Sequence, residues 1–180
     1  MHETAEDLHE LQQLLDRSHR SAGSHLRAII TPERRVSAAD LAQRLTGMTL
    51  LVLATVTADG RPIAGPVDGI FYRGAFHFGT SPEAVRWRHI RARPAVSATH
   101  LPGEDFAVTV HGRAVPVDVR AAEGEGLRKT LAEVYVPRYG SEWLEEFLDG
   151  SSDPARAPVY ARIEAERMFT FQMTSPEPGS

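Results

Sequence analysis

Five short stretches of β-type composition between Thr49 and Val119, most of them separated by turn signals, constrain this fold more than any other feature. The first stretch, 49–57, is rich in β-branched and apolar residues and ends at Asp59-Gly60, a dipeptide typical of a β-hairpin. The other four stretches are 61–72, 75–78, 95–100 and 106–119. Because parallel neighbours need long crossovers, this pattern predicts a small antiparallel barrel rather than a parallel α/β sheet.

Proline and glycine predict irregularities within these strands. Pro62 and Pro66 cannot donate ladder hydrogen bonds, so part of the second strand should lie at an edge or a bulge. The alternation of apolar residues in 106–119 changes phase midway, and both halves would face the same side only if the strand bulges at Gly112. A sixth strand is expected at 159–173, where apolar residues again alternate.

Helical spacing appears before and after the predicted strands. Residues 1–20 form an amphipathic pattern with leucines at 8, 11 and 15, and a small barrel offers this helix no obvious partner, so we expect it to lie across a partner subunit. Ser37 should cap a short helix that ends at Gly47. Two further helices are expected at 121–135 and 141–148. The predicted organisation is a helical extension (1–46), a barrel domain (47–173) with a helical insertion (120–150), and a tail (174–180).

The composition excludes several classes of function. The net charge of −4 over 180 residues favours neither a nucleic acid nor a membrane as partner. The chain has no cysteine, which excludes disulfides and thiolate chemistry and fits a cytoplasmic protein. The N-terminus lacks the apolar segment of a signal peptide, and no apolar run is long enough to span a bilayer.

The segment 76–88 is the strongest candidate for a binding site, because a strand there turns into a helix. Thr80 and Glu83 have the spacing of a capping box, which would place the helix start beside them. The free N–H groups of a helix start, with Arg86 and Arg88 one turn further on, can hold a phosphate. The alternative is a plain strand-to-helix corner with two solvated arginines.

The order and spacing of several motifs resemble those of the pyridoxamine 5′-phosphate oxidase-like family. The motifs are Leu51-x-Leu-Ala-Thr-Val-x-x-Asp-Gly-Arg-Pro62, Pro66-Val67, Gly74-x-x-x-Phe78-x-Thr80 and Arg86-x-Arg88-x-Ile90-x-x-x-Pro94-x-Val96. The resemblance implies a mainly β fold with flanking helices, namely a split β-barrel of the FMN-binding type with six or so antiparallel strands. It also implies a homodimer with the flavin in a cleft between the two barrels.

The resemblance carries over to particular positions. Arg86 stands where the family has a lysine that contacts the cofactor phosphate, and Thr80 matches a hydroxyl near the same phosphate. The segment 65–68 matches a strand whose backbone faces the isoalloxazine ring. The cofactor-binding residues that we expect are Gly65, Pro66, Val67, Asp68, Gly79, Thr80, Ser81, Arg86 and Arg88.

Departures from the family pattern argue against vitamin B6 oxidation. Ile63, Ala84 and Ala107 stand where true pyridoxamine phosphate oxidases have arginine, serine and glutamine, and residues 161–173 contain no histidine for the substrate motif. The sequence therefore predicts an FMN-binding oxidoreductase that acts on another small molecule, with no catalytic residue identified. The alternative is a non-catalytic split-barrel protein that binds a flavin, the deazaflavin coenzyme F-420 or haem.

Four histidines fall in or beside the predicted barrel, at positions 77, 89, 100 and 111. They lack the spacing of a metal site, so no metal is predicted. We expect them to be hydrogen-bonded or exposed, although one of them would serve as the ligand in the haem-binding alternative.

Overall fold

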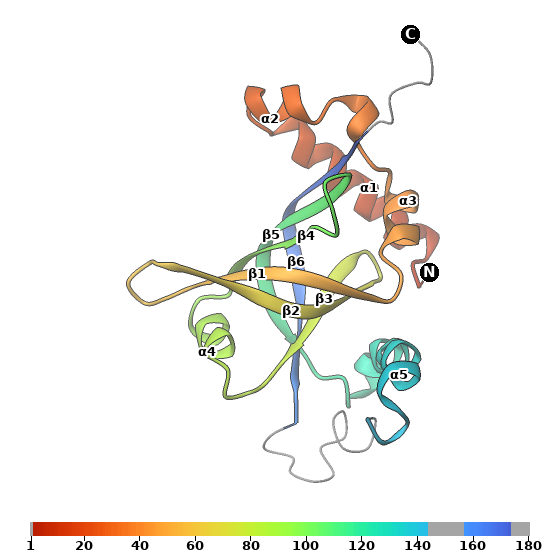
Figure 1. Cartoon of the computed structure of the whole chain (residues 1–180), viewed down its shortest axis with the longest axis vertical. Helices are drawn as coiled ribbons and strands as arrows, with labels where there is room; N and C mark the ends of the chain where they lie inside the picture. The colour runs from red at the N-terminus through yellow and green to blue at the C-terminus, as the bar shows by residue number, and fades with distance from the viewer. Residues whose placement is uncertain (1, 144–156, 174–180) are drawn as a thin grey trace.

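Antiparallel strands close into a barrel in the order β1-β2-β3-β6-β5-β4 in the computed structural model, which describes residues 2–143 and 157–173. The strands are β1 (Met48–Val56), β2 (Pro62–Tyr72), β3 (Ala75–Thr80), β4 (Ala95–His100), β5 (Phe106–Val117) and β6 (Val159–Gln172). The predicted fold class, a mainly β split barrel of six antiparallel strands with flanking helices, is confirmed (Figure 1).

The β1–β2 hairpin follows from its local sequence. In β1, Leu51, Leu53 and Thr55 point into the interior while the residues between them are less buried, as the alternation of a half-covered strand requires. The turn after Val56 reverses the chain because Gly60 adopts a φ of 85°, a region that favours glycine. The hairpin predicted at Asp59-Gly60 is therefore confirmed.

The second strand has an open edge along its first half. β2 pairs with β1 from Pro62 to Ile70, but it pairs with β3 only from Gly69 to Tyr72. Pro62 and Pro66 lie in the half without a neighbour on that side, where a missing N–H costs no ladder bond. The predicted edge is confirmed, and it is the opening on which the candidate site is built.

The predicted irregularity near Gly112 is present, but its extra residue belongs to the neighbouring strand. His111 pairs with Arg167 and Gly112 pairs with Ala165, so Glu166 of β6 is the unpaired residue. The alternation of β5 therefore continues without a break through its middle. The prediction that the later valines of this strand face the same side as Phe106, Val108 and Val110 is wrong for Val115 and Val117, which have the opposite parity.

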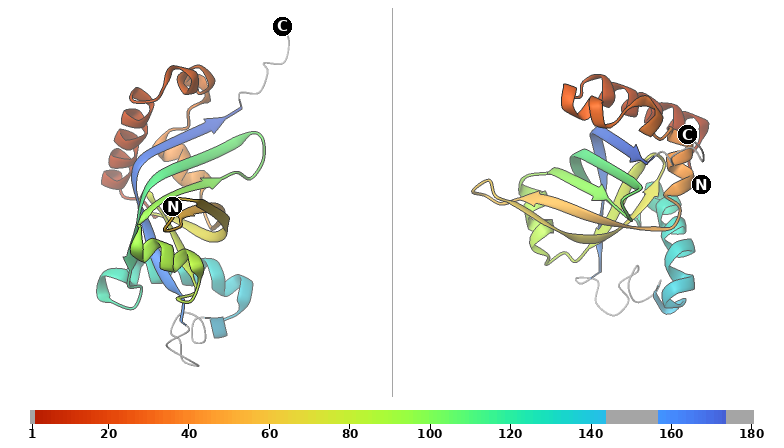
Figure 2. Two further views of the ribbon diagram at one scale, coloured as in Figure 1. Left: turned by 90° about the vertical axis from the view of Figure 1, so that its left-hand side faces the viewer. Right: turned by 45° about the horizontal axis from the view of Figure 1, so that its top comes forward.

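The helices gather at the two ends of the barrel. The N-terminal helices lie at the upper end in Figure 1, while α4 and α5 lie at the lower end, and Figure 2 shows the same separation. They are α1 (Ala5–Arg20), α2 (Ser24–Ile29), α3 (Ala38–Arg44), α4 (Val85–Ala92) and α5 (Glu125–Tyr139), with short 3₁₀ turns η1 (Pro32–Arg34) and η2 (Ala122–Gly124). Among the described residues, no helix has the length and apolarity needed to cross a membrane.

Several predicted helix boundaries change. The cap of α3 by the Ser37 side chain is confirmed, and α5 begins four residues later than the predicted helix at 121–135 because η2 precedes it. The connection at 21–35 contains α2 and η1. Most of the predicted helix at 141–148, the following loop and the tail 174–180 lie outside the described residues.

Helix α1 packs on its own barrel, so the prediction that it lies across a partner subunit is wrong. Leu11, Leu14 and Leu15 are buried in the same apolar cluster as the barrel interior. The Ser18 hydroxyl donates to the Leu14 carbonyl at 2.7 Å and accepts the Met168 N–H of β6 at 3.0 Å. The helix is therefore an integral part of the fold.

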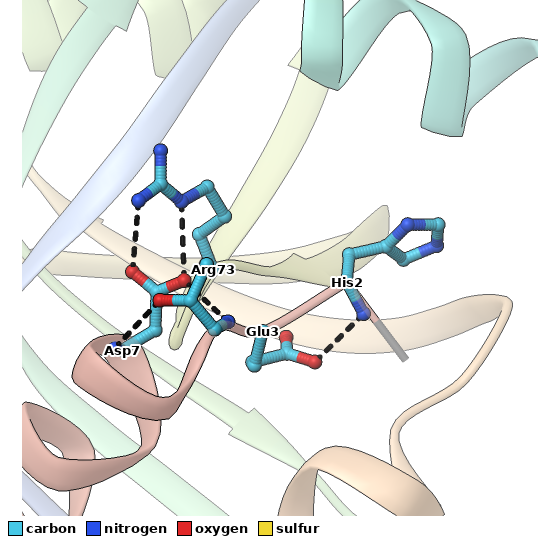
Figure 3. Close-up of polar contacts among 5 residues, drawn as sticks. His2, Glu3, Asp7 and Arg73 are labelled. Carbon is cyan, nitrogen blue, oxygen red and sulfur yellow. Dashed lines mark hydrogen bonds and ion pairs between the residues drawn. The ribbon is translucent and has the colours of Figure 1, made fainter.

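A polar contact fixes the other end of α1 (Figure 3). Asp7 forms a capping box with Thr4, and its carboxylate also accepts two hydrogen bonds from Arg73 in the β2–β3 turn, at 3.1 and 3.2 Å. Arg73 holds a positive φ of 49° in this turn. The same carboxylate thus starts the helix and ties it to the barrel.

Helix α5 covers the outer surface of the barrel beside the open edge. Leu127, Leu131 and Tyr135 form a second apolar cluster with Ile70 of β2 and Tyr160 of β6. Because Asp68 and Ile70 point to the same side of β2, this packing brings the end of α5 near Asp68.

Candidate functional site

The corner after β3 differs in detail from the predicted capping box. Helix α4 begins at Val85, and Ala84 is its N-cap. The Ser81 hydroxyl accepts the N–H of Glu83 at 3.2 Å and the Ser81 carbonyl accepts the N–H of Ala84 at 3.1 Å, so a serine-initiated turn takes the place of the first helical turn. The predicted Thr80–Glu83 capping box is therefore wrong, and Thr80 remains in the strand.

The N-terminus of α4 lacks a side-chain cap. Ala84 has no hydroxyl or carboxylate, so no side chain accepts from the first N–H groups of the helix. Arg86 lies in this first turn. An uncapped helix start with a guanidinium beside it is suited to an anion, because both the backbone donors and the helix dipole favour negative charge there.

Arg86 reaches from α4 to the open edge of β2. Its Nη1 donates to the Pro66 carbonyl oxygen at 2.8 Å. A Cβ atom placed on Gly65 would lie 3.6 Å from Arg86 Nη2, which is ordinary contact, so the guanidinium lies directly against this part of the strand. The structure thus brings together Gly65, Pro66 and Arg86, and the guanidinium has further N–H donors besides the one that bonds to Pro66.

A pocket of about 370 Å³ opens beside this contact, between the barrel and α5. It is lined by Asp68, Gly79, Thr80, Ser81, Tyr135, Tyr139, Trp143, Pro158 and Tyr160. Four of the predicted cofactor-binding residues therefore meet at one pocket. The volume is within the range of small-molecule sites.

The floor of the pocket is Tyr160 of β6, which packs directly on Gly79. A Cβ atom at Gly79 would lie 2.9 Å from Tyr160 Cε1, closer than a side chain permits. Burial raises the pKa of the Tyr160 phenol, and burial together with the nearby charge of Asp68 raises the pKa of Tyr135. Both phenols therefore stay protonated at physiological pH.

Aromatic residues that the sequence reasoning missed form the wall contributed by α5. The Tyr135 ring stacks on Trp143 with centroids 4.8 Å apart and on Tyr139 with centroids 5.9 Å apart. Tyr135 and Tyr139 lie four residues apart on α5, which places them on one side of the helix, and Trp143 follows after the helix has ended at Gly140. The spacing of the two tyrosines was the available signal. In the structure Tyr135 is buried, Trp143 packs against the second apolar cluster, and Tyr139 is 53% exposed.

Two predicted site residues take no part in these contacts. The Val67 side chain is buried among the barrel interior residues, so only its backbone faces the open edge. Arg88 is exposed, and because it lies two residues after Arg86 its side chain leaves the helix about 200° away.

The four histidines of the barrel each have a hydrogen-bond partner, as predicted. His77 Nδ1 lies 3.1 Å from the Ala75 carbonyl oxygen, and the other three contact a threonine, a backbone carbonyl and a serine. None of them lines the aromatic pocket. Within 2–143 and 157–173, no group of three potential metal ligands comes together.

The closed six-stranded barrel, with the open edge of β2 beside the connection from β3 to α4, defines the chain as a split-barrel protein. The family model for pyridoxamine 5′-phosphate oxidase matches residues 38–169, and the chain therefore belongs to this family. Among curated proteins, none matches the sequence.

Solved structures share the fold at low sequence identity. The conserved hypothetical protein Rv2991 from Mycobacterium tuberculosis is 20% identical with a TM-score of 0.62, and the alignment covers 83% of this chain and 96% of that one. A FAD-binding protein from Mesorhizobium loti is 20% identical with a TM-score of 0.55, covering 76% and 93%. The haem storage protein HutZ from Vibrio cholerae has the same identity and TM-score, covering 74% and 91%.

Proposed function

We propose that this protein binds FMN and acts as an oxidoreductase on a small molecule other than pyridoxamine 5′-phosphate. The observation that carries the proposal is Arg86, which lies in the first turn of an uncapped helix and reaches to the open edge of β2. That arrangement suits a phosphate next to a strand edge along which a flat ring can lie. FMN, when bound, would supply the redox chemistry, and the chain would supply anchoring and a shaped pocket.

The phosphate of FMN fits the groups at the corner. Arg86 provides a charged donor fork, the first turn of α4 provides backbone N–H groups, and Thr80 and Ser81 provide hydroxyls. Residues 65–68 would face the ring, since this half of β2 has no strand beside it. The substrate would occupy the aromatic pocket that adjoins Asp68.

The substrate is proposed to lie outside vitamin B6 chemistry because the residues of the family's substrate motif are missing. β6 carries no histidine, and Ile63 replaces the arginine before the ring-facing segment. We expect no oxidation of pyridoxamine 5′-phosphate by the protein supplied with FMN. Turnover on the order of one per second, a normal enzymatic rate, would contradict this.

The proposed assembly is a cytoplasmic homodimer with the flavin between two barrels. The first half of β2 is open on one side, and Leu50 and Val52 of the neighbouring β1 are about half exposed on the outer surface. A second copy placed here would cover both the apolar strip and the ring-facing segment. The proposal of a dimer is based on this surface, because α1 packs on its own barrel.

Haem is the alternative cofactor, since one structural neighbour is named as a haem storage protein and another as a FAD-binding protein. The residues favour flavin, because no histidine lines the aromatic pocket among its described residues. Separate titrations with FMN and with haemin distinguish the two. We expect saturable FMN binding with a shifted flavin spectrum, whereas a Soret change with haemin and no response to FMN would overturn the proposal.

A further inference from the structure

We propose that the aromatic pocket between β2 and α5 binds an organic cation with an apolar body, such as an arylalkylammonium ion. The inference names the substrate class of the proposed oxidoreductase and rests on that function for the role of substrate. Binding of the cation itself requires no flavin, so the two can be tested apart.

The charge of the pocket is the first argument. Of the described residues that line it, Asp68 is the only one with an acidic side chain, and none is an arginine, lysine or histidine. Arg86 does not line the pocket, and its Nη1 donates to the Pro66 carbonyl. The charges of Arg138 and Arg120 act on the phenols of Tyr135 and Tyr160, but neither arginine is among the lining residues. A cation in this pocket gains the opposite charge of Asp68, whereas an anion would be repelled by that carboxylate and could be held only at the Thr80 and Ser81 hydroxyls, the groups proposed for the FMN phosphate.

The aromatic walls are the second argument. Tyr135, Tyr139 and Trp143 stand in one stacked column, and Tyr160 closes the floor. Aromatic faces carry negative potential and attract cations, and aromatic side chains of this kind line the sites that recognise alkylammonium groups. Tyr139 already has a guanidinium, that of Arg138, 5.9 Å from its ring centroid, which shows that this ring accepts a cation.

The protonation of the phenols is the third argument. Burial raises the pKa of both Tyr135 and Tyr160, so neither phenol adds a charge of its own at physiological pH. They remain apolar rings with one hydroxyl each. The described lining therefore presents apolar aromatic surface and one carboxylate, that of Asp68. A cation that carries one aromatic ring complements both features.

The binding is tested with three small aromatic probes that share a ring and differ in charge. The probes are benzyltrimethylammonium, benzyl alcohol and benzoate, titrated into the full-length protein by calorimetry or ligand-observed NMR. We expect the cation to bind about fivefold more tightly than the alcohol, with benzoate the weakest. Binding of benzoate at least as tight as that of the cation, or no binding of the cation, would overturn the inference.

Two variants assign the preference to the pocket. Asp68→Asn keeps the shape and removes the charge, and should reduce the preference for the cation over the alcohol by about two- to fivefold. Tyr139→Leu should also reduce it by about two- to fivefold, and this position is exposed enough for the variant to fold. The matched control is Asp105→Asn, an exposed aspartate before β5 at the opposite end of the barrel. An equal effect of the control and Asp68→Asn would contradict the assignment.

A parallel titration with FMN separates this inference from the proposed function. If the cation binds and FMN does not, the pocket assignment stands and the oxidoreductase proposal fails. If FMN binds and the cation does not, the assignment of the pocket to a cation fails and the flavin proposal stands.

Discussion

His77 shows how one buried polar side chain makes the stability of this barrel depend on pH. His77 lies on β3 and is 6% exposed. Its Nδ1 donates to the Ala75 carbonyl, and its ring meets the Tyr72 ring in an edge-type contact with centroids 5.7 Å apart. Burial lowers the pKa of His77 to about 4, and the positive charge of Arg162 acts in the same direction. The imidazole is therefore neutral in the folded protein at physiological pH.

The pKa of His77 predicts a loss of stability on mild acidification. An unfolded imidazole has a pKa of about 6.5, so between about pH 6.5 and 4 the unfolded chain binds a proton that the folded chain does not. The free energy of unfolding should fall through this window by roughly 3 kcal/mol from this group alone. His77→Gln keeps a donor for the Ala75 carbonyl and cannot titrate, so its stability should change less between pH 7 and 4.5 in urea unfolding. The same pH dependence in both proteins would refute the assignment.

Among the elements, α1 is the clearest case of a helix whose role is set by tertiary packing. Leu15 is 2% exposed in the main core, and we expect Leu15→Ala to lower the free energy of unfolding by about 2–5 kcal/mol. The control is Leu101→Ala, because this leucine is 63% exposed and its loss should cost under about 0.5 kcal/mol. Chemical denaturation measures both. A small effect at Leu15 would indicate that α1 is only loosely attached to the barrel.

The local elements were largely predictable from sequence, because alternation, turn dipeptides and cap residues act over a few positions. The strand at 95–100 and the hairpin at Asp59-Gly60 are examples. The partner of α1 was not predictable, because an amphipathic pattern indicates that one face of a helix is buried but does not indicate which element covers it. The start of α4 was mispredicted because Ser81 competes with Thr80 for the local backbone donors.

The candidate site was predictable on the barrel side and not on the α5 side. The family pattern located Arg86 and 65–68, and the structure brings Arg86 to Pro66. The aromatic wall depends on α5 reaching around to β3, a contact between segments more than fifty residues apart in sequence. No short-range pattern contains that information.

At the scale of the whole molecule, the exposed strip on β1 predicts the assembly. Leu50 and Val52 are 54% and 52% exposed on the outer side of the barrel, and Val52 pairs with Pro66 at the open edge of β2. We expect a dimer at micromolar concentration in sedimentation velocity, because a second copy would cover this strip. Val52→Glu should shift the protein to monomer, while Ile29→Glu on α2, also exposed, should not. A monomeric wild-type protein would refute the dimer.

The most direct test of the flavin proposal compares FMN and riboflavin, which differ by the phosphate, on Arg86→Ala and the unchanged protein. Loss of a charge-assisted contact worth roughly 1.5–3 kcal/mol should weaken FMN binding by about ten- to a hundredfold. Riboflavin should bind both proteins almost equally, which separates loss of the anchor from general damage. Arg88→Ala, the matched control on the same helix, should leave FMN affinity unchanged. An Arg86→Ala variant with the FMN affinity of the unchanged protein, or an unchanged protein that binds neither flavin, would contradict the proposal.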